Sequence, residues 1–550
     1  MKKQFIFIIV ITIMAFLRTT NSYSQCNQNP TGFNEGNYQD NSKLFLSSDY
    51  EADISSLHLF HHLHRYSDDI TVKIIDINSP EYNGWGDCEF NNPAYQYFLI
   101  VPGDYRAWGA LKIRTSGTPN QPRIISYYNP DSTYPYRERL PVRGVNNPDE
   151  HVIVERLDMY EADYWIINGL TFSGHAESGA NGKIGGLYNR IVGNADYNII
   201  NRCLFENVVI GSNLRISHSN YNTIQNSVVR NLLGTDFVGI WIGGEYSVAI
   251  GNRIVNNEIY DCNDGVQLAY SSNWGEYGDL SGTVIENNDI YLTQRAYSDR
   301  EGYACAENAI DIKIGGKTNS PDDVVKILKN RIWGYRVSDT TCGPSGSNGS
   351  GIIIHQEARN ILIKDNVFFD LPTGIGISHK NDRNTNVAVI NNVFHRIKKY
   401  NDASAGIAIR SATRADIYYN TISDAVIAIH MDKNTYGGRI QCNTIIEALA
   451  VQAWQEDLPW SALNAWYDSN IDPDRVYSHM PEYNIVDNCA ARDDFGDFTF
   501  YRQRWTEPEK VTFTRLFAEN GSQIAMVTSP EIHCGPGGDG KRWWMWQVFQ

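Results

Sequence analysis

Residues 351–378 read GIIIHQEARNILIKDNVFFDLPTGIGIS and contain the two motifs that decide the fold. The first is Gly351-Ile-Ile-Ile-His355, in which apolar residues alternate with variable ones. The second is Asn366-Val-Phe-Phe369, an asparagine followed by mostly apolar residues. Alternation with a period of two residues is typical of β-strands. The strand motif begins again at Gly374, so this stretch holds one complete repeating unit.

Both motifs recur through the middle of the chain. The asparagine motif begins at Asn226, Asn257, Asn288, Asn330, Asn366, Asn392, Asn420 and Asn443, at spacings of 31, 31, 42, 36, 26, 28 and 23 residues. The strand motif begins at Gly239, Gly265, Ala309, Gly351, Gly374, Gly406 and Val426. A fixed motif at irregular spacing indicates one structural unit whose loops vary in length.

The repeats predict an all-β fold. Their strands are not separated by a helical pattern, which argues against βαβ crossovers. Successive units can instead stack, so that each strand pairs in parallel with its counterparts above and below. We therefore predict a right-handed, single-stranded parallel β-helix, with the asparagines bonded to one another from turn to turn. A seven-bladed propeller is the alternative, but several repeats are shorter than the ~40–45 residues of a propeller blade.

The composition excludes several classes of protein. The chain has 550 residues, of which 42% are hydrophobic and 12% aromatic, and this excludes a disordered, collagen-like or coiled-coil chain. Its 47 Lys+Arg against 63 Asp+Glu give a net charge of −16. Because phosphate binding needs a basic surface, we expect no nucleic-acid partner.

The first residues predict export. Lys2 and Lys3 precede an apolar run of 13 residues, 5–17, which is shorter than the ~20 residues of a membrane span. We interpret residues 1–24 as a signal peptide and expect a secreted or periplasmic protein without membrane insertion. Cys26 leaves a lipoprotein as the alternative.

The rest of the chain divides into three predicted parts. Residues 25–95 form an N-terminal segment and cap, with helical apolar spacing over 54–66. Residues 96–454 form the β-helix, and residues 455–550 form an aromatic-rich C-terminal cap. We expect a monomer. Among nine cysteines, Cys305 and Cys342 fall in adjacent long insertions and could form a disulfide, although both could also be free.

The outward-facing strand positions predict where the chemistry lies. Alternation gives two outward columns. The first is Arg215, Trp241, Gln267, Asp311, Ile353, Gly376, Ala408 and Ala428, and the second is Ser217, Gly243, Ala269, Lys313, His355, Ser378, Arg410 and His430. Polar residues gather on three consecutive coils, between the longest loops. Such a strip predicts a groove for an extended polymer.

The candidate catalytic residues are Lys313, Asp311 and His355. A lysine can act as a Brønsted base if burial or a nearby cation lowers its pKa. A surface ion pair between Lys313 and Asp311 is the simpler interpretation. The candidate substrate-binding residues are Gln267, Trp241, Arg215, Lys380 and Arg410, although Lys380 and Arg410 could equally be solvated surface charges.

Two short segments resemble a known family. Asn263-Asp264-Gly265-Val266-Gln267 followed by Ile312-Lys313-Ile314-Gly315-Gly316 is similar to the active coils of polysaccharide lyase family 9, the pectate lyases of the pectin lyase-like fold. The resemblance implies an acidic, uronic-acid-containing polysaccharide as substrate and β-elimination with Lys313 as the base. It also implies Ca²⁺ bound by Asn263, Asp264 and Gln267, with Asp236 as a further ligand. The family is rich in Asp at these positions, so a calcium site with amides here would bind more weakly.

Two other functions fit the same strip. A glycoside hydrolase acting on an acidic or sulfated polysaccharide needs two carboxylates, and Asp311 could pair with Glu307 or Asp264. A non-catalytic glycan-binding β-helix is the other alternative, although such faces usually carry plain polar or aromatic ladders. The cluster of Asp311, Lys313 and His355 favours an enzyme.

Overall fold

The structure is a computed structural model. It describes residues 72–129, 148–174, 188–208, 211–232, 238–243, 248–269, 278–293, 307–318, 320–335, 349–356, 358–379, 384–397, 405–425, 427–436, 439–441, 443–446, 449–453, 485–487, 512–513, 527–528, 532–533, 542–543 and 546–547. All of them belong to one compact unit, Gln39–Gln550, and a second unit, Met1–Tyr38, lies outside the described residues.

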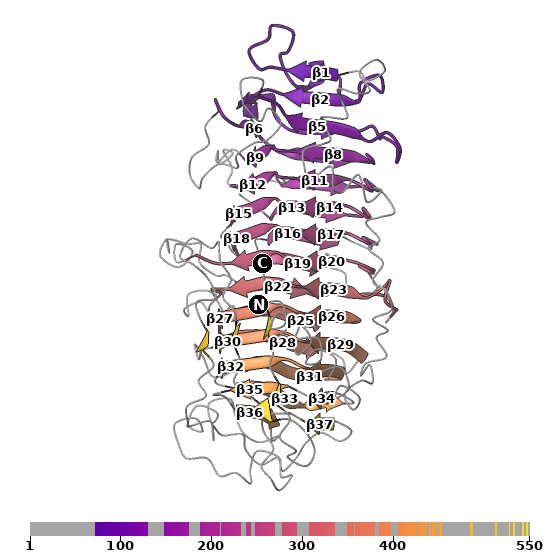
Figure 1. Cartoon of the computed structure of the whole chain (residues 1–550). Coiled ribbons are helices and arrows are strands. Elements are labelled where there is room, and N and C mark those ends of the chain that lie inside the picture. The colour runs from indigo at the N-terminus through magenta and orange to yellow at the C-terminus, as the bar shows by residue number, and fades with distance from the viewer. Residues whose placement is uncertain are drawn as a thin grey trace, which may run out of the picture. The chain divides into compact units, whose positions relative to one another are not determined.

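The chain winds in coils of three strands, and each strand pairs in parallel with strands of the neighbouring coils (Figure 1). The first ladder, which carries the candidate site, is β4 (Leu111–Ile113), β7 (Leu157–Tyr160), β10 (Asn189–Val192), β13 (Ser212–Ser217), β16 (Val238–Gly243), β19 (Asp264–Ala269), β22 (Asn308–Ile312), β25 (Ser350–Gln356), β28 (Thr373–His379), β31 (Ala405–Tyr418), β33 (Ile427–Tyr436) and β36 (Leu449–Ala453). The second ladder is β1 (Val72–Ile75), β2 (Tyr97–Ile100), β5 (Arg123–Tyr127), β8 (Trp165–Asn168), β11 (Ile199–Asn201), β14 (Thr223–Gln225), β17 (Arg253–Val255), β20 (Val284–Glu286), β23 (Val325–Leu328), β26 (Ile361–Lys364), β29 (Asn384–Ile390), β34 (Arg439–Gln441) and β37 (Ile485–Asp487).

The third ladder is a separate 12-stranded sheet. It comprises β3 (Gly103–Asp104), β6 (Val152–Val154), β9 (Thr171–Ser173), β12 (Leu204–Glu206), β15 (Val228–Leu232), β18 (Glu258–Cys262), β21 (Asp289–Tyr291), β24 (Arg331–Trp333), β27 (Val367–Leu371), β30 (Val393–Ile397), β32 (Thr421–Ala425) and β35 (Thr444–Ile446). The long strand β31 pairs with both β28 and β29 and so joins the first and second ladders into one 25-stranded sheet.

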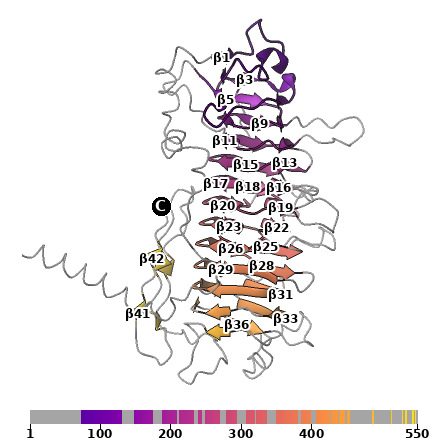
Figure 2. The ribbon, with the colours of Figure 1, turned by 90° about the vertical axis from the view of Figure 1, so that its right-hand side faces the viewer.

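These ladders confirm the predicted all-β parallel β-helix. A propeller is excluded because strands of successive coils pair in parallel and in order along the chain (Figure 2). Two short 3-10 helices, Trp85–Cys88 and Arg106–Trp108, are the helices of the described residues. Coiling begins upstream of residue 96, since β1 already pairs with β2.

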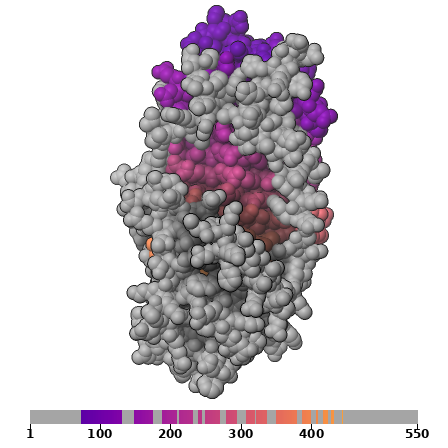
Figure 3. All heavy atoms as spheres, viewed as in Figure 1, coloured from indigo at the N-terminus to yellow at the C-terminus, as the bar shows by residue number. Residues whose placement is uncertain are grey.

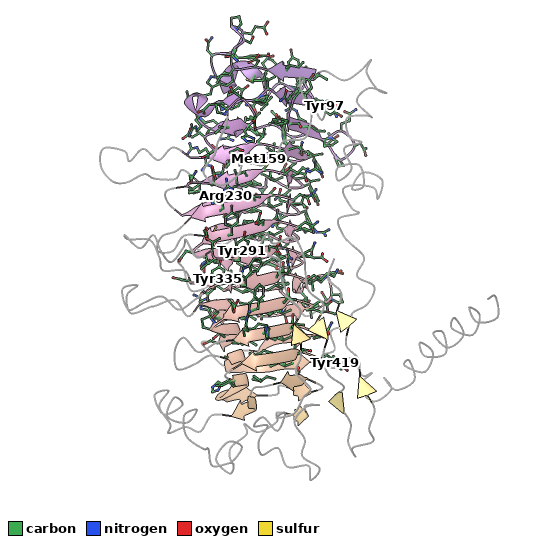
Figure 4. All side chains as sticks on the ribbon, turned by 60° about the vertical axis from the view of Figure 1, so that its left-hand side comes forward. Tyr97, Met159, Arg230, Tyr291, Tyr335 and Tyr419 are labelled. Carbon is green, nitrogen blue, oxygen red and sulfur yellow. The ribbon has the colours of Figure 1, made fainter. Side chains whose placement is uncertain are left out.

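Alternating side chains fill the coils. On the first ladder the inward positions Ile240, Val266, Ile310, Ile352 and Ile375 are all fully buried. Phe172 stacks on Phe205, and Phe368 on Phe394, across neighbouring coils. Met159 and Tyr335, which are labelled in Figure 4, are both fully buried.

The predicted ladder of asparagines is present: buried asparagines at the same turn of successive coils bond to one another. From Asn257 to Asn443, each amide Nδ2 donates a hydrogen bond to the amide oxygen of the next asparagine in the series Asn257, Asn288, Asn330, Asn366, Asn392, Asn420 and Asn443. The prediction is wrong for Asn226, because Ser227 occupies this place and its backbone N–H donates to Asn257. Asn226 is the preceding residue, at a φ of 51° in the left-handed region.

Several predicted features lie outside the described residues. These are the signal peptide, the 54–66 helix and the Cys305–Cys342 pair, as well as most of the C-terminal segment. That segment contributes five described short antiparallel strands, β38 (Thr512–Phe513), β39 (Val527–Thr528), β40 (Ile532–His533), β41 (Arg542–Trp543) and β42 (Trp546–Gln547). Cys88, Cys203 and Cys262 are buried. Within the described part of the chain, none of the helices has the length and apolarity needed to cross a bilayer.

Candidate active site

The site is built on three neighbouring strands of the first ladder, β19, β22 and β25. Their register places Gln267 beside Asp311 and Asp311 beside Ile353, as the outward column predicts. Figure 3 shows residues of the middle coils, in magenta to brown, at the surface on this side of the molecule. Parallel pairing therefore brings together side chains that are 44 residues apart in the sequence.

Asp311 is the centre of the cluster. Its side chain is 2% exposed, and its two oxygens lie close to two ionisable side chains, those of His355 and Lys313. His355 Nε2 lies 2.6 Å from Asp311 Oδ1, and Lys313 Nζ lies 2.9 Å from Asp311 Oδ2. The side chains of His355 and Lys313 are 31% and 23% exposed. Both therefore reach solvent, while the buried Asp311 carboxylate holds them in place.

Asp311 and Lys313 stabilise each other's ionised form. Burial alone would raise the pKa of Asp311, but the hydrogen bond with His355 and the charge of Lys313 lower it below its usual range. Burial also acts to lower the pKa of Lys313, but attraction to Asp311, and then to Asp264 and Glu307, raises it. In this geometry Lys313 is therefore an ammonium group at neutral pH.

A second carboxyl lies close by. Gln267 Nε2 donates to Asp264 Oδ2 at 3.1 Å and to Asp311 Oδ2 at 3.0 Å, so these two oxygens are no farther apart than the sum of those distances. Asp264 also accepts a hydrogen bond from the backbone N–H of Asn308 at 3.1 Å. Its pKa is raised well above the usual range by burial and then by repulsion from Asp311 and Glu307. Asp264 thus favours its neutral form, whereas Asp311 favours the anion.

Asn263 has the features expected of a ligand. Its side chain is buried, and neither its Oδ1 nor its Nδ2 has a hydrogen-bond partner among the described residues. A buried amide without partners costs free energy, which a cation on Oδ1 would recover in part. Asn263, Asp264 and Gln267 offer the oxygen donors that Ca²⁺ prefers. The described residues contain no group of three or more His, Cys, Asp or Glu side chains placed for a metal ion, and Asp236 lies outside them.

The predicted substrate-binding residues have different outcomes. Arg215 and Trp241 are in register, and the Arg215 guanidinium lies 4.2 Å from the centre of the Trp241 ring. Lys380 lies outside the described residues, as does the side chain of Arg410. A register shift after Ile377 pairs Ser378 with Ser411, so the placement of Arg410 in the second column is wrong. One coil further, the predicted alignment is wrong by two residues, because His430 rather than Ala428 pairs with Ala408.

The sequence patterns did not predict one cluster of charged residues on the first ladder. Arg114, Asp158 and Arg190 belong to the opening coils, where the strand motif is too weak to align by sequence. The alternation of buried and partly exposed residues in Asn189-Arg190-Ile191-Val192 places Arg190 outward and could have indicated this cluster.

Comparison with known proteins gives distant structural likenesses. No family model and no curated protein matches this sequence. The catalytic unit of a GH87 α-1,3-glucanase from Streptomyces thermodiastaticus is similar with a TM-score of 0.40 and 10% identity, over 66% of this chain and 60% of that one. Pectate lyase Pel9A gives a TM-score of 0.35 and 15% identity over 60% of this chain and 77% of that one. An alginate lyase from a Paenibacillus species gives a TM-score of 0.33 and 13% identity, over 68% of this chain and 97% of that one. Likeness at this level does not assign a reaction to this chain.

Proposed function

We propose that this chain is a secreted polysaccharide-degrading enzyme that cleaves an acidic, uronic-acid-containing polymer by β-elimination. The observation that carries the proposal is the pairing of one buried carboxylate, Asp311, with two partly exposed proton-carrying groups, Lys313 and His355. A cation and an imidazole on adjacent coils suit a substrate that is an anion and must lose a proton. Residues 1–24 support secretion.

The reaction needs a proton acceptor and a positive charge. The base removes the proton α to the uronate carboxyl, the electron pair forms a carbon–carbon double bond, and the glycosidic carbon–oxygen bond breaks. The leaving oxygen then takes up a proton. Negative charge develops on the carboxyl group in the transition state, where a fixed cation stabilises it.

The geometry supports a division of labour between the two groups. The resemblance to family 9 implies Lys313 as the base, but the raised pKa of Lys313 favours its ammonium form. We assign the sugar carboxylate to Lys313 and proton abstraction to His355, because imidazole is the commonest general base near neutral pH. Asp311 holds both side chains in place.

Calcium is a further part of the proposal. Asn263 and Asp264, with Gln267, would hold Ca²⁺ beside the Asp311 cluster through their oxygens. When bound, the ion would favour the ionised form of Asp264, and its positive charge would offset Asp264, Glu307 and the sugar carboxylate.

A glycoside hydrolase is the second candidate. Asp264 and Asp311 have opposite pKa shifts, which is the pattern of an acid–base pair. Their bridged oxygens are nearer than the ~6.5–9.5 Å typical of inverting enzymes, so a retaining mechanism is the form that this pair supports. Both side chains are deeply buried, which makes direct attack on a sugar harder than for His355 and Lys313.

One assay separates these functions. The full chain is incubated with polygalacturonate, alginate, ulvan and chondroitin sulfate, with added calcium or with a chelator. We expect one polymer to yield new reducing ends together with the ultraviolet absorbance of an unsaturated uronate, and the chelator to slow the reaction. Reducing ends without that absorbance would favour the hydrolase, and neither signal on any polymer would favour a binding protein.

A further inference from the structure

The outward column that contains Asp311 continues toward the N-terminus as a basic surface. In register along the first ladder lie Lys112, Asp158, Arg190, Arg215 and Trp241, followed by Gln267 and Asp311. Arg114 reaches the same place from the end of β4. We call Lys112, Arg114, Arg190 and Arg215 the cationic strip.

Asp158 organises the strip as Asp311 organises the active site. Its side chain is 4% exposed and binds two guanidinium groups. Arg190 Nε and Nη2 lie 2.8 and 3.1 Å from its two oxygens, and Arg114 Nη2 lies 3.0 Å from Oδ2. Burial would raise the pKa of Asp158, but hydrogen bonds from Arg190 and Arg114 lower it. Asp158 therefore stays ionised and holds both arginines.

The strip has more positive charge than Asp158 neutralises. Two guanidinium groups share one carboxylate, and the side chains of Arg190 and Arg114 are still 42% and 34% exposed. Lys112 is exposed beside Asp158. Arg215 lies between the Tyr188 and Trp241 rings, 5.5 and 4.2 Å from their centres, so its charge is fixed in place. This excess is local in a chain whose net charge is −16.

Position and chemistry together indicate the ligand. Guanidinium groups bind carboxylates and sulfates in a two-pronged manner, which a flexible lysine cannot do. Five coil steps of ~4.8 Å put Asp158 ~24 Å from Asp311 along one face. A chain of anionic sugars lying along this face would reach both clusters at once.

We propose that the cationic strip is a distal binding site for the carboxylate or sulfate groups of an anionic polysaccharide, and that the polymer runs from Lys313 toward the N-terminal coils. This inference rests on the proposed function for the identity of the polymer. It adds a binding site that lies outside the catalytic cluster and gives the chain a preference for long substrates.

The test uses binding by the full chain rather than turnover. Affinities are measured by affinity electrophoresis for the anionic polymers polygalacturonate, alginate, ulvan and chondroitin sulfate, for a neutral glucan and for a single-stranded polynucleotide. The variants are Arg190→Gln, which leaves Arg114 to pair with Asp158, and Arg215→Gln, which leaves the Asp158 cluster intact. Arg396→Gln is the matched control, because Arg396 pairs with Asp370 on the third ladder and its side chain is 40% exposed.

We expect each strip variant to bind the polymer roughly tenfold more weakly, since a hydrogen bond to a charged group contributes about that factor. Arg396→Gln should bind as the original chain does, and melting temperatures should confirm that all variants fold. Unchanged polymer affinity in both strip variants would overturn the inference, as would equal losses for the neutral glucan or tighter binding of the polynucleotide. A chain that binds through the strip but cleaves no polymer would leave the inference standing and refute the proposed function.

Discussion

Lys313 and His355 share one buried carboxylate, and the roles of these two residues can be separated by the chemistry of their replacements. Arginine keeps the positive charge of Lys313 but cannot lose its proton in a protein. Glutamine keeps part of the shape of His355 and cannot accept a proton as a base.

We expect Lys313→Arg to retain measurable lyase activity, while Lys313→Ala and His355→Gln each lose about 10²–10⁴-fold. Initial rates of the unsaturated-product absorbance would measure this, with Lys329→Gln, directly after β23 of the second ladder, as the control. If Lys313→Arg is as inactive as Lys313→Ala while His355→Gln remains active, Lys313 is the base, as the family 9 resemblance implies.

At the scale of the element, the asparagine ladder fastens each coil to the next. Asn366 accepts hydrogen bonds from the backbone N–H and from Nδ2 of Asn330. Its own Nδ2 donates to Ile327 O, Lys364 O and Asn392 Oδ1. All of these hydrogen bonds except the one to Lys364 O are buried, so that water does not replace a lost partner.

Replacing Asn366 by Ala should lower the free energy of unfolding by at least about 2–3 kcal/mol, because each buried polar group left unpaired costs about 1–3 kcal/mol. Asn78→Ala is the matched control, since Asn78 is exposed and bonds within its own turn. Denaturant unfolding followed by circular dichroism measures the difference. Equal midpoints for the two variants would contradict a stabilising role for the ladder.

At the scale of the whole molecule, a local basic strip lies on a strongly acidic chain. The net charge of −16 repels a polyanion over the Debye length, which is about 30 Å at 0.01 M salt and about 10 Å at 0.1 M. The strip and Lys313 attract the polymer only at short range.

Adding salt should therefore act in two stages on kcat/KM for an acidic polymer. Between about 0.01 and 0.1 M the rate constant should rise, because the long-range repulsion is screened first. Toward 1 M it should fall, because the close contacts are then screened as well. The affinity for a neutral glucan should show neither stage, and a steady decrease of kcat/KM from the lowest salt onward would contradict this account.

Sequence patterns predicted the register of the first ladder from Arg215 to Ala408, because parallel coils repeat the same alternation. The predicted positions were wrong at two places where the alignment of one coil with the next is offset by one residue. A bulge after Ile377 removed Arg410 from the second column, and Ser227 replaced Asn226 in the asparagine ladder. Neither change has a local signal, since serine and asparagine both suit turns.

The sequence by itself determined the coil, the two motifs that build it and the gathering of Gln267, Asp311, Lys313 and His355 on neighbouring strands. Only the tertiary structure decided which groups are buried and which charges meet. Gln267 links Asp264 to Asp311, and Asp158 binds both Arg114 and Arg190, across 32 to 47 residues of chain. These contacts between distant residues depend on how loops of unequal length connect the strands of each coil. The ionisation of each group then follows from its burial and neighbours, which are properties of the folded chain.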